Sequence, residues 1–172
     1  MVKGMFFVKN WNVPEFIRFN ENYVQDDKVK SVMSPFFSDG RWKSEQAFIK
    51  FLEETESVEW WFKNGDRDKV FFAVSYTNED QKPFYIDFIV QMKDGKIGLF
   101  DTKAGFTQNI AGPKIDGLRK YIKIENRKGQ HLFGGIVTNT DQRNYQGRWI
   151  YFNKAGSEMK DNNFDNWETL EL

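Results

Sequence analysis

Two aspartates and a lysine lie in two apolar runs near the middle of the chain. Asp87 lies in the run from Pro83 to Met92, and thirteen residues separate it from Asp101-Thr102-Lys103, which ends the next run. Aspartate is depleted in β-strands and is seldom buried without a partner, so these positions need an explanation. Two carboxylates and an ammonium group that converge could hold a divalent metal ion and a water molecule beside it. This combination indicates hydrolysis of a phosphodiester bond.

The two apolar runs predict an antiparallel hairpin that turns at residues 93–96. A strict two-residue turn would set Asp87 opposite Thr102, and Asp101 and Lys103 would then point to the other face of the hairpin. A three-residue turn, or one β-bulge in the second strand, would bring all three side chains to one side. The chemistry therefore requires a specific irregularity in this hairpin.

Further elements on both sides of the hairpin are predicted from hydrophobic periodicity and from turn residues. They follow the order helix, strands, helix, strand. The expected elements are a helix with Ser44 as N-cap that continues to about Glu56, strands at Val58–Phe62 and Val70–Thr77, the hairpin, a helix at Ala111–Asn126 with Pro113 as its first helical residue, strands at His131–Asn139 and Arg148–Asn153, and an acidic end that forms a short helix or frays.

The central stretch resembles the PD-(D/E)XK nuclease superfamily, and more closely the carboxy-terminal endonuclease domain of the Res subunits of type III restriction enzymes. The resemblance covers roughly residues 41–140. Asp87 matches the metal-binding aspartate of that family, and Asp101 and Lys103 match its D/E-x-K triplet. The segments 60–65 and 95–97 also look like the Res pattern. Ile86 departs from it where the motif name has proline, and aspartate at position 101 departs from it because glutamate is commoner there.

The resemblance implies an α/β fold with a restriction-endonuclease-like core, in which helices flank a central mixed β-sheet. It implies a Mg²⁺-dependent DNA endonuclease of restriction type, in which Mn²⁺ can substitute for Mg²⁺. Asp87 and Asp101 would be catalytic metal ligands, and Lys103 would orient or deprotonate the attacking water. The backbone carbonyl of Thr102 and the side chain of Glu45, on the first predicted helix, would complete the metal site.

Duplex DNA is the expected substrate, although the formal net charge of the chain is zero. Residues 103–154 contain ten lysines and arginines against three acidic residues, so a local positive surface could neutralise phosphates. The expected DNA-binding residues are Lys114, Arg119, Lys120 and Lys123. The chain has no G-x-x-x-x-G-K-[ST] loop and therefore no evident ATP site. The resemblance thus implies a separate helicase or translocase domain and a modification subunit as partners.

A chain of 172 residues is expected to form one compact domain. Residues 1–40 are expected to be an N-terminal extension or a strand pair, formed by Met5–Trp11 and Glu15–Phe19 and packed on the nuclease-like domain of residues 41–172. The loop Asn20–Lys30 would follow this pair. The chain has no cysteine, no long apolar run and no signal-peptide pattern, so a cytoplasmic protein with no membrane partner is expected.

Other interpretations fit the same residues. Asp101 and Lys103 could form a simple ion pair at a strand end, and Glu45 could be an acid favoured by the helix dipole in the first helical turn. The basic residues of the second helix could be a solvated face, and Trp60 and Trp61 are expected in the core. The whole chain could also be a nuclease-fold binding or interaction module without cleavage activity, or an unrelated α/β domain with a chance motif.

Overall fold

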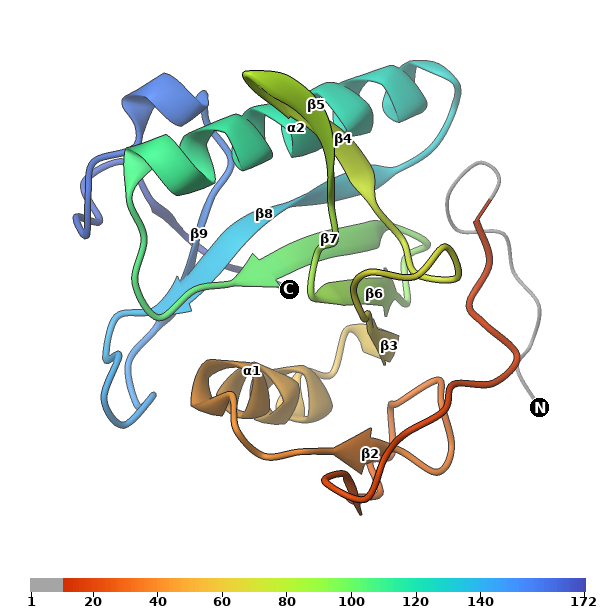
Figure 1. Ribbon diagram of the computed structural model, residues 1–172. Helices are drawn as coiled ribbons and strands as arrows, with labels where there is room; N and C mark the ends of the chain where they lie inside the picture. Colours follow the sequence, from red (N-terminus) through yellow and green to blue (C-terminus); the bar gives the residue numbers. More distant parts are fainter. Residues whose placement is uncertain (1–10) are drawn as a thin grey trace.

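The computed structural model describes residues 11–172, and a six-stranded mixed β-sheet lies at its centre. Only β7 and β8 are parallel, and the other neighbouring strands of this sheet are antiparallel. The expectation of a central mixed sheet flanked by helices is confirmed (Figure 1). In spatial order, the strands are β10 (Glu168–Thr169), β9 (Trp149–Phe152), β8 (Leu132–Asn139), β7 (Ile97–Thr102), β6 (Phe88–Met92) and β3 (Val58–Lys63).

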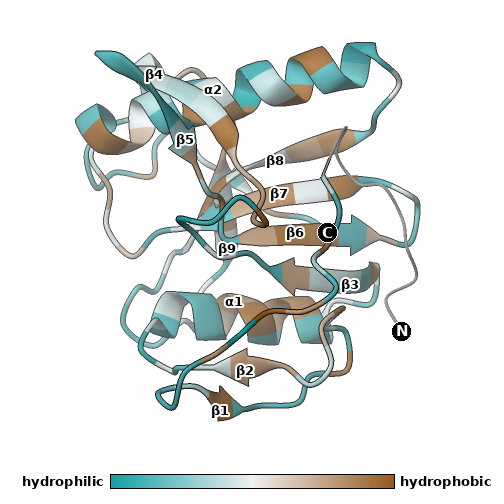
Figure 2. Cartoon of the chain, turned by 45° about the vertical axis from the view of Figure 1, so that its right-hand side comes forward, coloured by the Kyte–Doolittle hydropathy of each residue, from teal (hydrophilic) through white to brown (hydrophobic). Residues whose placement is uncertain are grey.

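Two long helices cover the two faces of this sheet. Consecutive residues of a strand point to opposite faces, so Leu99 of β7 packs with α2 (Gln108–Arg127) and Phe100 packs with α1 (Lys43–Glu54). Figure 2 shows the two helices on opposite sides of the strands, whose hydrophobic stretches lie between them. The sheet therefore has a separate hydrophobic core on each face.

Both helices begin before their predicted starts. The N-cap of α1 is Trp42 and not Ser44, and no side chain caps this end. The N-cap of α2 is Thr107, so Pro113 lies inside the helix and not at its first position. A proline so close to the N-terminus removes one backbone hydrogen bond, which the long helix tolerates. Within residues 11–172, neither helix is long and apolar enough to cross a membrane.

A two-stranded hairpin separates β3 from β6 along the chain and lies beside α2 (Figure 1). Its strands are β4 (Val74–Asn78) and β5 (Asp80–Phe84), so the strand predicted at Val70–Thr77 begins four residues later. The predicted strand Pro83–Met92 is also divided, because its first residues pair in β5 and residues 85–87 bend before β6. The hairpin of β4 and β5 approaches α2 closely at Gly117. A Cβ at this position would lie 2.6 Å from the backbone oxygen of Ser75 in β4.

The segment before α1 contains a strand pair, but at other residues than predicted. β1 (Val24–Gln25) pairs with β2 (Phe37–Ser38), whereas the predicted loop Asn20–Lys30 contains β1 and the predicted strand Glu15–Phe19 is irregular. The other predicted strand, Met5–Trp11, lies outside the described residues except for its last residue. At the acidic end, a single turn of 3₁₀ helix, η1 (Gly156–Glu158), precedes the edge strand β10.

Candidate functional site

The hairpin of β6 and β7 has the register that the chemistry requires. The last pair of the ladder is Phe88 with Phe100, so Asp87 and Asp101 are the next residues along the two strands. The turn holds three residues, because the amide of Met92 donates a hydrogen bond of 2.9 Å to the carbonyl of Lys96. Gly95 in this turn has a φ of +91°, a conformation that glycine adopts without strain. The three-residue alternative for the turn is the one that the structure contains.

A bend immediately before β6 directs Asp87 toward the end of β7. Asn64 follows the end of β3, is buried and holds this bend. Its amide nitrogen donates hydrogen bonds to the carbonyls of Phe72 (2.7 Å) and Ile86 (2.8 Å), and its oxygen accepts one from the Phe72 amide. The backbone N–H of Asn64 also donates a hydrogen bond of 2.8 Å to the carbonyl of Asp87. Asn64 is therefore a positioning residue for Asp87.

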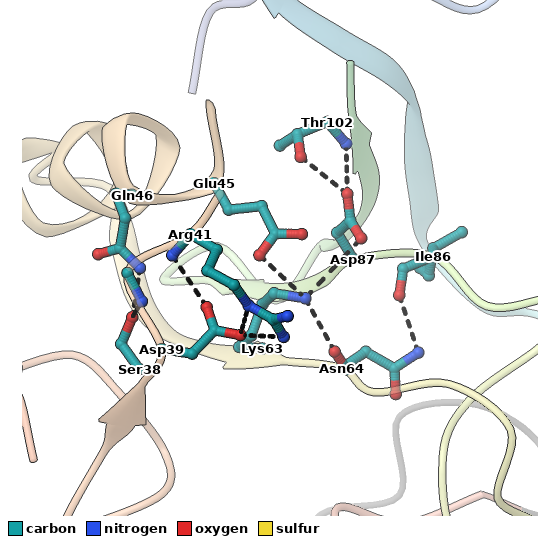
Figure 3. A network of polar contacts seen from close by, with 11 residues as sticks. Ser38, Asp39, Arg41, Glu45, Gln46, Lys63, Asn64, Ile86, Asp87 and Thr102 are labelled. Carbon is teal, nitrogen blue, oxygen red and sulfur yellow. Dashed lines mark hydrogen bonds and ion pairs between the residues drawn. The ribbon is translucent and has the colours of Figure 1, made fainter. Parts of the chain in front are cut away.

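The carboxylate of Asp87 lies where β6 separates from β7. Its Oδ2 accepts two hydrogen bonds from Thr102, one from the amide and one from the hydroxyl, each of 2.8 Å (Figure 3). The N–H and C=O of a strand residue point to the same side, so the carbonyl of Thr102 also points toward Asp87. These bonds leave Oδ1 of Asp87 for another partner.

Asp101 and Lys103 form the second part of the site. Asp101 is only 2% exposed, and the ammonium of Lys103 lies 2.5 Å from its Oδ2 as an ion pair. Within residues 11–172, Lys103 is the partner that this buried oxygen has, and the contact is an ion pair. Burial and the neighbouring Asp87 charge raise the pKa of Asp101 to about 7, although Lys103 opposes the shift. Burial lowers the pKa of Lys103, but the charges of Asp101, Asp87 and Glu45 outweigh it and the net shift is upward.

Glu45 reaches the site from α1. Phe48, three residues later on the same face of the helix, packs against Phe88 and Phe100 and so holds α1 on the sheet. Burial raises the pKa of Glu45 to about 7, and the charges of Asp87 and Asp101 add to this shift while Lys63 opposes it. Glu45 thus lies close enough to both aspartates to sense their charges.

Lys63 is a residue of the site that sequence reasoning did not select. Its ammonium lies 3.5 Å from Oε2 of Glu45 and 3.8 Å from Oδ1 of Asp87 (Figure 3). It also donates a hydrogen bond of 3.0 Å to the carbonyl of Asn64 and lies 5.4 Å from the centre of the Phe88 ring. Lys63 lies within the segment 60–65 noted in the sequence, but no role was assigned to it, because a lysine at the end of a strand is commonly a solvated side chain.

Among the expected DNA-binding residues, Lys114 is the one that the structure brings to the site. Burial and the charge of Lys103 lower the pKa of Lys114, while the charges of both aspartates oppose this shift. Arg119, Lys120 and Lys123 are exposed on α2. At about 100° per residue, they lie roughly 140° to 240° around the helix from Lys114. These three side chains therefore face away from the site.

Two hollows in the surface lie at opposite ends of the hairpin. One of about 280 Å³ is bounded by Lys103 and by the apolar side chains of Phe106 and Ile110. The larger hollow, of about 800 Å³, lies around the turn of the hairpin and includes none of the residues of the site. Of these two hollows, the smaller one is the one whose lining includes a residue of the site, Lys103.

The arrangement provides two carboxylates in register, a third acid from α1 and three lysines. No group of three or more acidic, histidine or cysteine side chains in residues 11–172 is arranged to hold a metal ion. An ion would therefore depend on Asp87, Asp101, backbone oxygen and water, and Mg²⁺ commonly keeps several water ligands. Comparison of the chain with protein-family models, with curated proteins and with solved structures finds no match.

Proposed function

We propose that this chain is a divalent-metal-dependent endodeoxyribonuclease domain of the PD-(D/E)XK kind, similar to that of type III Res subunits. The observation that carries the proposal is the register of the hairpin, whose last pair, Phe88 with Phe100, lies next to Asp87 and Asp101, while Lys103 pairs with the buried Asp101. The order of α1, three antiparallel strands, α2 and a strand parallel to β7 is consistent with a restriction-endonuclease-like core.

The residues present fit a Mg²⁺ or Mn²⁺ ion. Asp87 has one carboxylate oxygen free of hydrogen bonds from Thr102, and Asp101 pairs with Lys103 through Oδ2, so its Oδ1 would be the oxygen that binds an ion. These oxygens and the Thr102 carbonyl would hold the ion, and oxygen is the donor that both metals prefer. When bound, the ion would supply positive charge to the phosphate and lower the pKa of a water molecule.

Lys103 would act on the water and on the reacting phosphate. Its ammonium is held by Asp101, and Lys103 lines the 280 Å³ hollow, so it would donate hydrogen bonds to groups that enter this space. Because its pKa is raised, Lys103 is protonated at neutral pH. It would therefore orient the water and stabilise the negative charge that develops on phosphate. Duplex DNA, a motor domain and a modification subunit are the partners of this proposal.

The deep burial of Asp101 favours a second candidate function. Asp101 is only 2% exposed, and its side chain is one methylene shorter than that of glutamate. Its carboxylate could therefore bind Lys103 alone and not reach a metal ion. The domain would then be a nuclease-fold module that binds DNA or a protein without cutting. In that case Asp101→Glu, which restores the missing methylene, should create metal-dependent cleavage.

Metal-dependent cleavage of plasmid DNA by the purified chain tests the proposal. We expect the wild type to cut with Mg²⁺ or Mn²⁺, and Asp101→Ala to lose cleavage because a ligand is removed. Asp94→Ala is the matched control, since this exposed aspartate lies at the opposite end of the same hairpin. Equal cleavage by wild type and Asp101→Ala would overturn the proposed site. A chain that cuts only as Asp101→Glu would establish the second candidate.

A further inference from the structure

We infer that the ammonium of Lys63 occupies the position of a second cation, so that this site takes one divalent ion and not two. The inference deepens the proposed function and depends on it. Lys63 lies between two carboxylates from different elements, Glu45 of α1 and Asp87 before β6. Figure 3 shows its side-chain nitrogen at the point where interactions with these two acids meet. A metal ion that bridged Glu45 and Asp87 would have to occupy the position of the Lys63 ammonium.

Lys63 is held in this position by several contacts. Its backbone pairs with Phe88 in the sheet, and its side chain lies against the Phe88 ring and is 24% exposed. Its ammonium donates to the carbonyl of Asn64, the residue that fixes the bend at Asp87. Withdrawal of Lys63 would break these contacts, so a second ion would have to displace a charge that the fold holds in place.

Distances make joint occupancy unfavourable. Metal ligands lie about 2.0 to 2.6 Å from Mg²⁺ or Ca²⁺, whereas the Lys63 nitrogen is 3.5 Å and 3.8 Å from the two candidate oxygens. An ion bound to both oxygens would therefore lie within a few ångströms of the ammonium, and the two positive charges would repel each other.

The charge balance of the site supports the same conclusion. Three carboxylates (Glu45, Asp87 and Asp101) are matched by three ammonium groups (Lys63, Lys103 and Lys114). One divalent ion would give this group a net charge of +2, which suits a phosphodiester and an attacking hydroxide. Two ions would give +4 in a partly buried space, where excess charge is costly.

Mn²⁺ binding to the full chain, measured by electron paramagnetic resonance and by titration calorimetry, tests the inference without cleavage. We expect one ion per wild-type chain and two per Lys63→Met chain, since the neutral side chain vacates the second position. Lys63→Arg keeps the positive charge and should bind one ion. The double variant Lys63→Met/Glu45→Gln should return to one, because the second ion loses a ligand. Lys50→Met, at an exposed lysine of α1 that pairs with Glu54 outside the site, is the matched control and should bind one.

The outcomes separate the inference from the proposed function. Two ions in the wild type, or one ion in a folded Lys63→Met chain, would overturn the role of Lys63 and leave the nuclease proposal standing. No Mn²⁺ bound to the wild type at millimolar concentration would overturn both. Circular dichroism of each variant establishes that it is folded. If Lys63→Met does not fold, Lys63→Gln gives the same neutral position and carries the test.

Discussion

Lys103 is the side chain for which chemistry and metal binding can be separated. It contacts Asp101 but supplies no metal ligand, because an ammonium group has no free electron pair. We expect Lys103→Ala to lower the rate of plasmid cleavage by about 100-fold or more, which corresponds to about 3 kcal/mol of transition-state stabilisation. Mn²⁺ binding should persist in the variant. Initial cleavage rates and Mn²⁺ titrations, measured on the same preparation, check this prediction.

Lys96→Ala is the control for Lys103→Ala, since this lysine forms an exposed ion pair with Asp94 at the turn of the hairpin. It should cut at the wild-type rate. If Lys103→Ala cuts as fast as the Lys96→Ala control, Lys103 has no role in cleavage, even if the substitution changes the stability of the chain.

The sequence predicts the residues of the site that carry a recognisable pattern and misses those defined by distant contacts. Asp87, Asp101 and Lys103 were selected by type and spacing, and Glu45 by resemblance, and the structure brings these four into one charged cluster. Lys63 was not selected, because its partners lie 18 residues before it and 24 residues after it. Such an ion pair leaves no periodic signal in the chain.

At the scale of elements, Asn64 holds together three segments: the end of β3, the residue Phe72 and the bend before β6. Asn64→Ala would leave buried backbone groups without partners, at a cost of about 3 kcal/mol in the free energy of unfolding. It should also weaken Mn²⁺ binding several-fold, because Asp87 loses its fixed direction. Urea denaturation and Mn²⁺ titration measure the two effects.

Asn126→Ala is a matched control for this element. Asn126 makes the same kind of paired hydrogen bonds, to the amide and the carbonyl of Leu132, but at the far end of α2. We expect Asn126→Ala to lower stability without any change in Mn²⁺ affinity. Equal loss of affinity in both variants would show that general stability, and not the bend at Asp87, controls the site.

The elements themselves were predicted unevenly, for reasons that follow from local signals. The hairpin of β6 and β7 was predicted from two apolar runs and a turn rich in polar residues, and β8 from a long apolar run. The division at residues 85–87 was missed, because the apolar pattern continues across the bend. What breaks the strand there is the tertiary contact with Asn64, which a local pattern does not contain.

For the whole molecule, the charges are distributed differently from the expected single basic face. The excess of lysine and arginine in residues 103–154 is real in the sequence, but helix geometry turns Arg119, Lys120 and Lys123 away from Lys114. The charges that meet at the site come instead from α1, β3, the bend before β6, the end of β7 and α2, where three carboxylates meet three ammonium groups. Net charge along a segment therefore did not predict the charge of the surface.

This balance has a consequence for the stability of the whole fold in the absence of metal. The pKa of Asp101 is raised from 3.8 and that of Glu45 from 4.5, each to about 7, by burial and by neighbouring carboxylates. A carboxyl group with a raised pKa in the folded state adds stability that is fully present below its unfolded pKa and is lost as the pH rises through 7. The free energy of unfolding in EDTA should therefore fall between pH 5 and pH 8, by roughly 2 kcal/mol for each of the two groups. Urea denaturation at each pH measures it. Asp101→Asn should flatten this decrease, whereas Asp66→Asn, at an exposed aspartate, should not. A free energy of unfolding that rises from pH 5 to pH 8 would contradict the raised pKa values.

Addition of Mg²⁺ at pH 8 should restore stability to the wild type and not to Asp101→Asn, because an ion bound to the charged carboxylate stabilises only the folded chain.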